Sequence, residues 1–192
     1  MSIVTGVVIN ITRSAGPETK ESSMHAPRSL GAYGLTLVLG MSGGCGVIQK
    51  CAPPAPPVSA PSAPAGISSS CTDLVNVERA KAGLAPVTVV GALTQAAQDH
   101  STYQAKQQTM THTGSNGSNA GQRMEAQGFA WSTWAENVAA GQVDCPSVMS
   151  AWMGSAGHRA NILNPTMTSI GIGAATGANG VPYWTMDLAA AR

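Results

Sequence analysis

The chain has 192 residues, a formal net charge of +1 and only 10% charged side chains. From Cys71 to the C-terminus, six Lys and Arg residues are balanced by seven Asp and Glu residues, and they form no basic stripe. A nucleic-acid partner is therefore excluded, because phosphate neutralisation supplies most of the affinity of such binders. The four cysteines include no Cys-x-x-Cys pair, which argues against a structural zinc site built from thiolates.

Residues 1–44 are interpreted as a leader that contains a signal peptide. An apolar run from Leu30 to Met41 follows Arg28, and it is too short to span a bilayer, which takes about 20 apolar residues. A basic flank, a short apolar core and then small residues are typical of a secretory signal peptide. Because the basic region normally opens such a peptide, Met24 is a candidate for the true start of the chain.

Residues 45–70 are interpreted as a tether rich in Pro, Ala and Ser. Cys45 directly follows Ser42-Gly-Gly, which resembles the lipobox of bacterial lipoproteins except that Ser42 stands where Leu is usual. Lipidation at Cys45, ordinary cleaved secretion and an uncleaved anchor all stay open. A lipid anchor would connect the protein to a membrane, although one acyl chain alone holds weakly. Residues 52–66 carry six prolines and no charge, which favours an extended spacer over a segment without a role.

Residues 71–192 are expected to form one domain that begins with helices. The pattern of apolar residues, capping residues and glycines predicts helices at Cys71–Gly83, Ala92–Gln108, Gly121–Gln127 and Pro146–Met153. In the first helix, Asn76 and Arg79 share a face and are expected to tie it to neighbouring loops. The alanines of the second helix suggest close packing against another layer. A polar stretch at residues 111–120 is too rich in Gly, Ser and Asn to be regular.

The C-terminal part of the domain changes to the period of a β-strand. Residues 169–174 and 182–188 are β-like runs, joined by a turn centred on Asn179-Gly180. Helices first and a hairpin last predict an α+β layered domain instead of a βαβ repeat. Trp152 and Trp184 are expected in the core. Trp131 and Trp134 are expected to flank a loop, where they could line a ligand surface or cover the core.

Five phrases of the domain resemble the CAP superfamily of cysteine-rich secretory, antigen 5 and pathogenesis-related proteins in its short bacterial form. They are LVNVERAKAGLAPV, MTHTG, AENVAAG, AWMGSAGHRANILNP and IGIGAATGANGVPYWTMDLA, which come in the family's order and cover nearly all of residues 71–192. The resemblance implies an α-β-α sandwich, in which a small antiparallel sheet lies between two helical layers.

The resemblance also implies a polar cleft. His112 matches the family's first cleft histidine, Glu136 its first glutamate, and His158 its second histidine. The family's second glutamate usually follows a tryptophan, but here Trp152 is followed by Met-Gly-Ser without a carboxylate. The cleft is therefore expected to contain three of the four usual residues.

These residue types permit more than one chemistry. His112 and His158, expected in loops or loop–helix junctions, could hold a divalent metal such as zinc together with Glu136. They could equally form a hydrogen-bonded network without a metal, or serve as acid and base. His100 lies on an apolar helix face and is expected to be a packing histidine. Hydrolysis by a metal-bound water would also need a general base, and residues 71–192 contain neither His-Glu-x-x-His nor Gly-x-Ser-x-Gly.

Cys71 and Cys145 are the two cysteines inside the domain. In an exported protein such a pair is expected to form a disulfide, with two free buried thiols as the alternative. Asn137 and Asn161 are expected to anchor neighbouring backbone groups.

The sequence thus predicts an exported cell-envelope protein whose cleft binds a small ligand, a divalent metal, or both. Lipids are among the ligand classes that the resemblance allows. The alternatives are a metal-dependent hydrolase acting on peptide or cell-wall material, and a structural or adhesive module with a vestigial cleft. A binding role is preferred to an enzymatic one, because no catalytic phrase accompanies the cleft residues.

Overall fold

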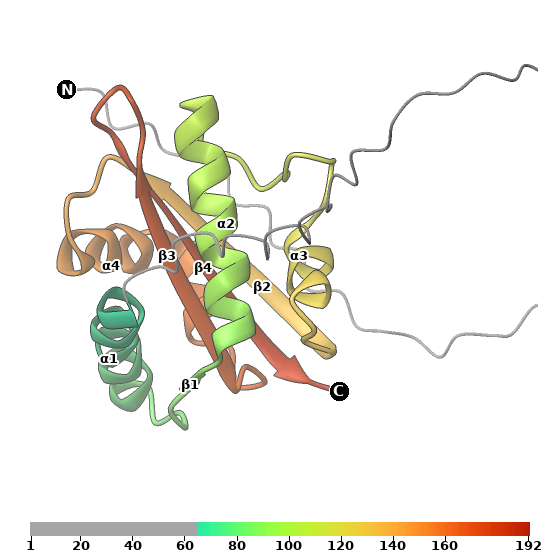
Figure 1. Cartoon of the computed structure of the whole chain (residues 1–192). Coiled ribbons are helices and arrows are strands. Elements are labelled where there is room, and N and C mark those ends of the chain that lie inside the picture. The colour runs from blue at the N-terminus through green and yellow to red at the C-terminus, as the bar shows by residue number, and fades with distance from the viewer. Residues whose placement is uncertain (1–64) are drawn as a thin grey trace, which may run out of the picture. The chain divides into compact units, whose positions relative to one another are not determined.

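The computed structural model describes residues 65–192 (Figure 1). The leader, Met24, Cys45 and most of the expected tether lie outside the described residues. The elements follow one another as α1 (Ala65–Lys81), β1 (Thr88–Val89), α2 (Gly91–Gln107), α3 (Ala120–Ala126), β2 (Trp131–Ala140), α4 (Cys145–Gly154), α5 (Ala156–Ile162), β3 (Ser169–Thr176) and β4 (Pro182–Ala191).

The strands form one sheet with the order β1-β3-β4-β2. Strands β3, β4 and β2 are antiparallel neighbours, whereas β1 runs parallel to β3. The sheet is therefore mixed, which corrects the expectation of an antiparallel one. The cause is local: the Thr88 N–H donates to the Thr168 carbonyl and the Val90 N–H to the Ile170 carbonyl, which adds a two-residue strand at the edge.

Helices cover both faces of this sheet, so the predicted α-β-α sandwich is confirmed (Figure 1). The face covered by α1, α4 and α5 has an apolar core. It is built from α1, from the helices after β2, and from alternate residues of β3 and β4, among them Val75, Trp152, Ile170, Ile172, Met186 and Leu188. Trp152 and Trp184 both belong to this core, as expected.

The opposite face is covered by α2 and α3. Gly171 and Gly173 of β3 face α2, and a Cβ atom at either glycine would overlap the α2 backbone. The expected close packing of the alanine-rich helix is therefore confirmed. Trp134 lies in the smaller core of this face, and the Trp131 indole N–H donates to the Gly121 carbonyl at 3.1 Å.

Three local expectations were wrong. Helix α1 begins at Ala65 and not at Cys71; Ser68 is buried there, and its carbonyl accepts from the Thr72 hydroxyl at 2.7 Å. The stretch flanked by the tryptophans is the strand β2 and not a loop. His158 lies inside the short helix α5 instead of at a junction.

The helices that carry or flank the site have defined ends. Asn119 and Gln122 form a capping box at the start of α3, and Asp144 and Ser147 form one at the start of α4. Over residues 65–192, every helix is too short or too polar to cross a membrane.

Candidate functional site

The site is centred on the carboxylate of Glu136, in the middle of β2. The Glu136 side chain is 2% exposed. Its Oε1 atom is 2.7 Å from Nδ1 of His112, and its Oε2 atom is paired with Nη2 of Arg123. Both carboxylate oxygens are therefore engaged by side chains from segments that lie before β2 in the chain.

The loop that carries His112 is held in place by polar contacts to α2 and α3. Gln104 of α2 accepts from the Thr111 N–H at 3.1 Å. The Arg123 Nη1 atom of α3 donates to the carbonyls of His112 and Ser118, at 3.1 and 2.9 Å. Arg123 therefore neutralises Glu136 and also fixes the loop that brings His112 to it.

The hydrogen bond to Glu136 determines which ring nitrogen of His112 is left without a hydrogen bond. An ionised carboxylate can only accept, so His112 Nδ1 must donate to it. The other ring nitrogen, Nε2, is buried and has no hydrogen-bond partner among the described residues. In a neutral imidazole this Nε2 atom carries the free lone pair.

His100 of α2 lies against the same carboxylate. It is 1% exposed, as expected for a packing histidine. Its Nε2 atom is 2.7 Å from the Thr111 carbonyl and 4.0 Å from Glu136 Oε2. Burial lowers the pKa of His100, although the charge of Glu136 opposes this shift. Its position beside Glu136 was not predicted from the sequence.

Asp187 is a second buried carboxyl group at the site, and sequence reasoning missed it. It lies directly opposite Glu136 in the β2–β4 register and is 0% exposed. Neither of its oxygens has a hydrogen-bond donor among the described residues. The signal in the sequence was the alternation in β4, where Thr185 and Asp187 fall on one face between Trp184, Met186 and Leu188.

The surroundings shift the pKa values of the two carboxyl groups in opposite directions. Burial, followed by the charge of Glu136, raises the pKa of Asp187 well above its usual range. Burial also acts to raise the pKa of Glu136, but His112, Arg123 and His100 outweigh it and lower that pKa. These opposite shifts favour a protonated Asp187 beside an ionised Glu136. A protonated Asp187 can donate to Glu136, which gives its otherwise unpaired carboxyl a partner.

His158 reaches the site from α5, at the other side of β2. Asn137 donates to the His158 carbonyl at 3.2 Å, and Asn161 donates to the Asn137 side chain at 2.9 Å and to the Glu136 carbonyl at 3.4 Å. The expectation that both asparagines anchor backbone is confirmed. Burial lowers the pKa of the His158 imidazole, and the neighbouring charge of His112 lowers it further.

The three-ligand metal site at His112, Glu136 and His158 stays a prediction. Within residues 65–192, no group of three or more His, Cys, Asp or Glu side chains is arranged to hold a metal ion. The physical reason is that Glu136 is already engaged by His112 and Arg123. The structure brings His112 and Glu136 into direct contact, and it leaves the imidazole of His158 near His112 without a bond to Glu136.

The expected disulfide is present on the other side of the sheet. Cys71 of α1 and Cys145 of α4 are bonded, with their Cα atoms 5.3 Å apart and a separation of 74 positions in sequence. Cys71 is fully buried in the apolar core.

Residues 72–188 match the family model of CAP, the cysteine-rich secretory protein family. The chain belongs to the CAP family. Its motifs lie on the elements just described: the Ala-Glu-Asn phrase on β2, the His-Arg-Ala-Asn phrase on α5, and the Ile-Gly-Ile-Gly phrase on β3.

Proteins of similar sequence include YkwD of Bacillus subtilis (strain 168), which is 36% identical over 115 residues, or 60% of this chain and 45% of YkwD. YlbC, a membrane protein of the same organism, is 31% identical over 101 residues, covering 53% of this chain and 29% of YlbC. The chain thus spans less than half the length of these relatives.

Solved structures share the fold. An extracellular protein from Bacillus anthracis that contains an SCP domain matches 65% of this chain and 40% of its own, with a TM-score of 0.59 and 23% identity. An outer surface protein of Borrelia burgdorferi matches 65% of this chain and 92% of its own, with a TM-score of 0.59 and 19% identity.

Proposed function

We propose that this CAP domain is an extracytoplasmic binding module whose cleft receives a divalent ion or a small polar ligand at Nε2 of His112. The observation that carries the proposal is the contact between His112 Nδ1 and Glu136 Oε1, 2.7 Å long, with Nε2 left unpartnered among the described residues. Histidines that bind metals characteristically donate their other ring N–H to a carboxylate, which fixes the tautomer. Glu136 therefore acts as a positioning residue and not as a ligand.

His158 is the second donor in this proposal. Its pKa is lowered by burial and by the neighbouring His112, so it is neutral at physiological pH, as coordination requires. Two imidazoles are fewer than the three protein ligands of a catalytic zinc site. We therefore expect an exchangeable ion or polar ligand, with water completing its shell, instead of a resident metal.

A hydrolase is the weaker alternative. A general base must come within hydrogen-bond reach of the proton that it removes. Glu136 is 2% exposed and both of its oxygens are engaged, so it has no free lone pair directed toward solvent. The described residues offer no other carboxylate in contact with His112.

The extracytoplasmic location is supported by the disulfide between Cys71 and Cys145, because disulfides persist in oxidising compartments. It agrees with the extracellular and outer-surface proteins that share the fold. Fractionation of cells that produce the full chain tests it: recovery of the protein with the cytoplasm, with both thiols free, would contradict the proposal.

Calorimetric titration of the full chain with zinc at pH 7.5 tests the cleft. We expect saturable binding that is lost in His112→Ala and strongly weakened in His158→Ala, because each variant removes one donor. The affinity should fall as the pH drops from about 7.5 to about 5.5, since protons compete with metal for the imidazoles. The variant Glu125→Gln removes an exposed carboxylate and should bind like the parent.

Zinc binding that survives the loss of both histidines would place the ion elsewhere in the chain. Absence of saturable binding at every pH would contradict the metal-binding form of the proposal. If small polar ligands also failed to shift the His112 resonances, the domain would be a structural module with a vestigial cleft.

A further inference from the structure

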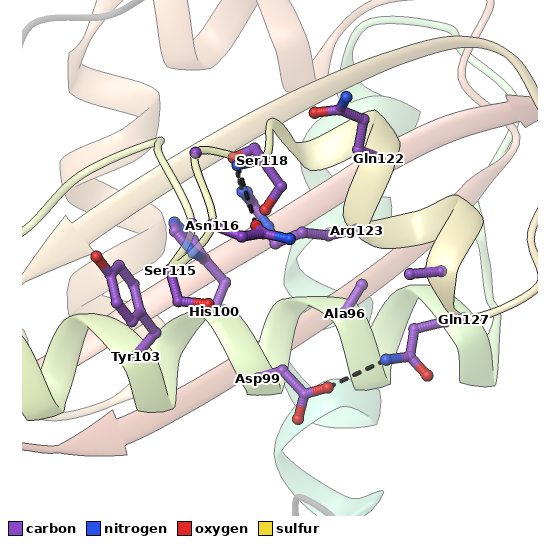
Figure 2. A pocket seen from close by; sticks show the side chains of 13 residues that line it. Ala96, Asp99, His100, Tyr103, Ser115, Asn116, Ser118, Gln122, Arg123 and Gln127 are labelled. Carbon is purple, nitrogen blue, oxygen red and sulfur yellow. Dashed lines mark hydrogen bonds between the residues drawn. The ribbon is translucent and has the colours of Figure 1, made fainter. Parts of the chain in front are cut away.

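A pocket of about 410 Å³ lies between α2, α3 and the loop at residues 114–118 (Figure 2). Its volume falls within the range of about 300–1,000 Å³ that is typical of small-molecule sites. His100 and Arg123 line it, whereas the proposed cleft residues His112, Glu136 and His158 do not. The pocket therefore shares His100 and Arg123 with the surroundings of the Glu136 carboxylate. It does not include the proposed cleft residues.

Two buried polar atoms of the pocket's lining residues have no hydrogen-bond partner in the described part of the chain. They are Nδ1 of His100, whose side chain is fully buried, and Nε of Arg123. Figure 2 shows the two side chains extending toward one another from α2 and α3. Buried polar atoms without partners cost free energy, and a native structure needs a reason to keep them.

The chemistry of the missing partner follows from the bonds already made. The Thr111 carbonyl can only accept, so His100 Nε2 donates to it. In the neutral ring Nδ1 is then an acceptor, while Arg123 Nε is always a donor. One acceptor and one donor, on two side chains that line the same pocket, match a hydroxyl group, which donates one hydrogen bond and accepts others.

The charges around the pocket favour a neutral ligand. Arg123 is neutralised by Glu136. Asp99, on the opposite wall, is held by Gln95 and Gln127 at 2.8 and 3.1 Å and would repel an anion. A cation would in turn meet the Arg123 guanidinium, whose positive charge opposes the attraction of Asp99.

The remaining walls suit a molecule with several hydroxyl groups and one apolar face. Ser115, Asn116, Ser118 and Gln122 contribute hydroxyl and amide groups from the loop and α3. The Tyr103 ring stacks on His100 with the ring centroids 6.1 Å apart and forms an aromatic wall (Figure 2). An aromatic face packs well against the C–H face of a pyranose, and the tyrosine hydroxyl adds a polar edge.

We propose that this pocket is a binding site for a neutral saccharide unit, with one sugar hydroxyl between His100 Nδ1 and Arg123 Nε. The site is independent of the His112 cleft, because the two share no proposed ligand-contacting atom. Failure of zinc binding would leave this proposal untouched, and the reverse also holds.

Titration of the ¹⁵N-labelled full chain with glucose, N-acetylglucosamine, glucuronate and N-acetylglycinamide, followed by NMR, tests the proposal. The neutral sugars should give saturable shifts confined to residues 96–103, 114–118 and 122–127, and glucuronate should bind more weakly. Absence of saturable shifts with either neutral sugar would overturn the proposal. A preference for glucuronate or for the amide would overturn the assignment of the ligand class.

Two variants locate the site. Ala126→Phe fills the pocket from α3 without removing a polar contact, and it should weaken sugar binding by about tenfold or more, which corresponds to about 1.4 kcal/mol. His100→Leu removes the acceptor and should have a comparable effect if it folds. Lys106→Ala changes an exposed residue of α2 that does not line the pocket; it is the control and should bind like the parent. Sugar binding that survives Ala126→Phe would show that the pocket is not the site.

Discussion

The two faces of the sheet are packed by different chemistry, and strand β3 shows this within four residues. Ile170 and Ile172 enter the apolar core under α1, α4 and α5, whereas Gly171 and Gly173 lie against the α2 backbone. On β4 the same alternation separates apolar Met186 and Leu188 from Thr185 and Asp187. One face therefore contributes mainly burial of apolar area, while the other holds polar and ionisable groups out of water.

Burying the polar groups of the second face costs free energy, and the place where this cost is left uncompensated points to function. Part of this polar face is fully satisfied: Ser101 donates to the Gly173 carbonyl at 3.0 Å and is hydrogen-bonded to the Thr185 hydroxyl at 3.0 Å, and Gln104 donates to Thr185 at 3.0 Å. The Glu136 region is not, because His112, Arg123 and Asp187 each keep a buried polar atom without a partner among the described residues. A folded domain keeps buried polar atoms without partners chiefly where a functional site requires them.

Removal of the disulfide is the largest change that we predict, and it belongs to the apolar face. The double variant Cys71→Ala, Cys145→Ala should lower the free energy of unfolding by about 4–5 kcal/mol, the chain-entropy value for a loop of this length. Denaturant unfolding of the parent and the variant measures the difference. Amide resonances around Glu136 should stay unchanged, because the bond joins α1 to α4 on the other side of the sheet. A loss below about 1 kcal/mol would mean that packing alone holds α1.

The fold was largely predictable, and its missed elements have physical causes. Helix α2 and the β3–β4 hairpin carry clear periodic patterns. Strand β2 was missed because it is covered on both faces: Trp134 through Ala139 are all buried, so the period-two alternation disappears. Helix α5 was missed because its seven residues are too few to establish a helical period.

The site was predictable in part. The motifs assigned His112 and Glu136, and the structure brings them into contact. Arg123 was missed because nothing in its helix reveals that it reaches a strand residue and a loop carbonyl together. Asp187 was missed because its role depends on the register between β2 and β4, which is set by long-range pairing that a single strand's sequence does not encode.

Glu136→Gln is the second largest change, and it probes the polar face. The Arg123 side chain is 10% exposed, and the variant leaves its charge without a carboxylate. Loss of one partner of a buried ion pair costs about 3–5 kcal/mol, and we expect about 3 kcal/mol because the amide oxygen of glutamine still accepts one hydrogen bond. Denaturant unfolding at pH 7 measures it, with the exposed Glu125→Gln as control, for which we expect a change within about 0.5 kcal/mol. Equal effects of the two variants would show that the Glu136 network is not a buried ion pair.

Asp187→Asn is the smallest change and has the opposite sign. Because the pKa of Asp187 is raised in the folded state, the unfolded chain gives up this proton at about pH 3.9 while the folded chain keeps it. Stability is therefore lost as the pH rises from about 4 toward the folded pKa, and the residue is a net cost at pH 7. Asparagine supplies an N–H donor to Glu136 without a titrating proton, so we expect a gain of about 1–2 kcal/mol at pH 7.

That gain should shrink as the pH falls toward 4, where Asp187 is protonated in both states. Unfolding free energies of the parent and Asp187→Asn across pH 4–8 measure it, and Asp99→Asn serves as the control because that carboxylate is exposed. A loss of stability at pH 7 would show that Asp187 is ionised and held by a donor on the polar face. The polar face would then satisfy its buried charges as fully as the apolar face buries its side chains. The contrast between the two faces would be smaller than the buried, unpaired carboxyl indicates.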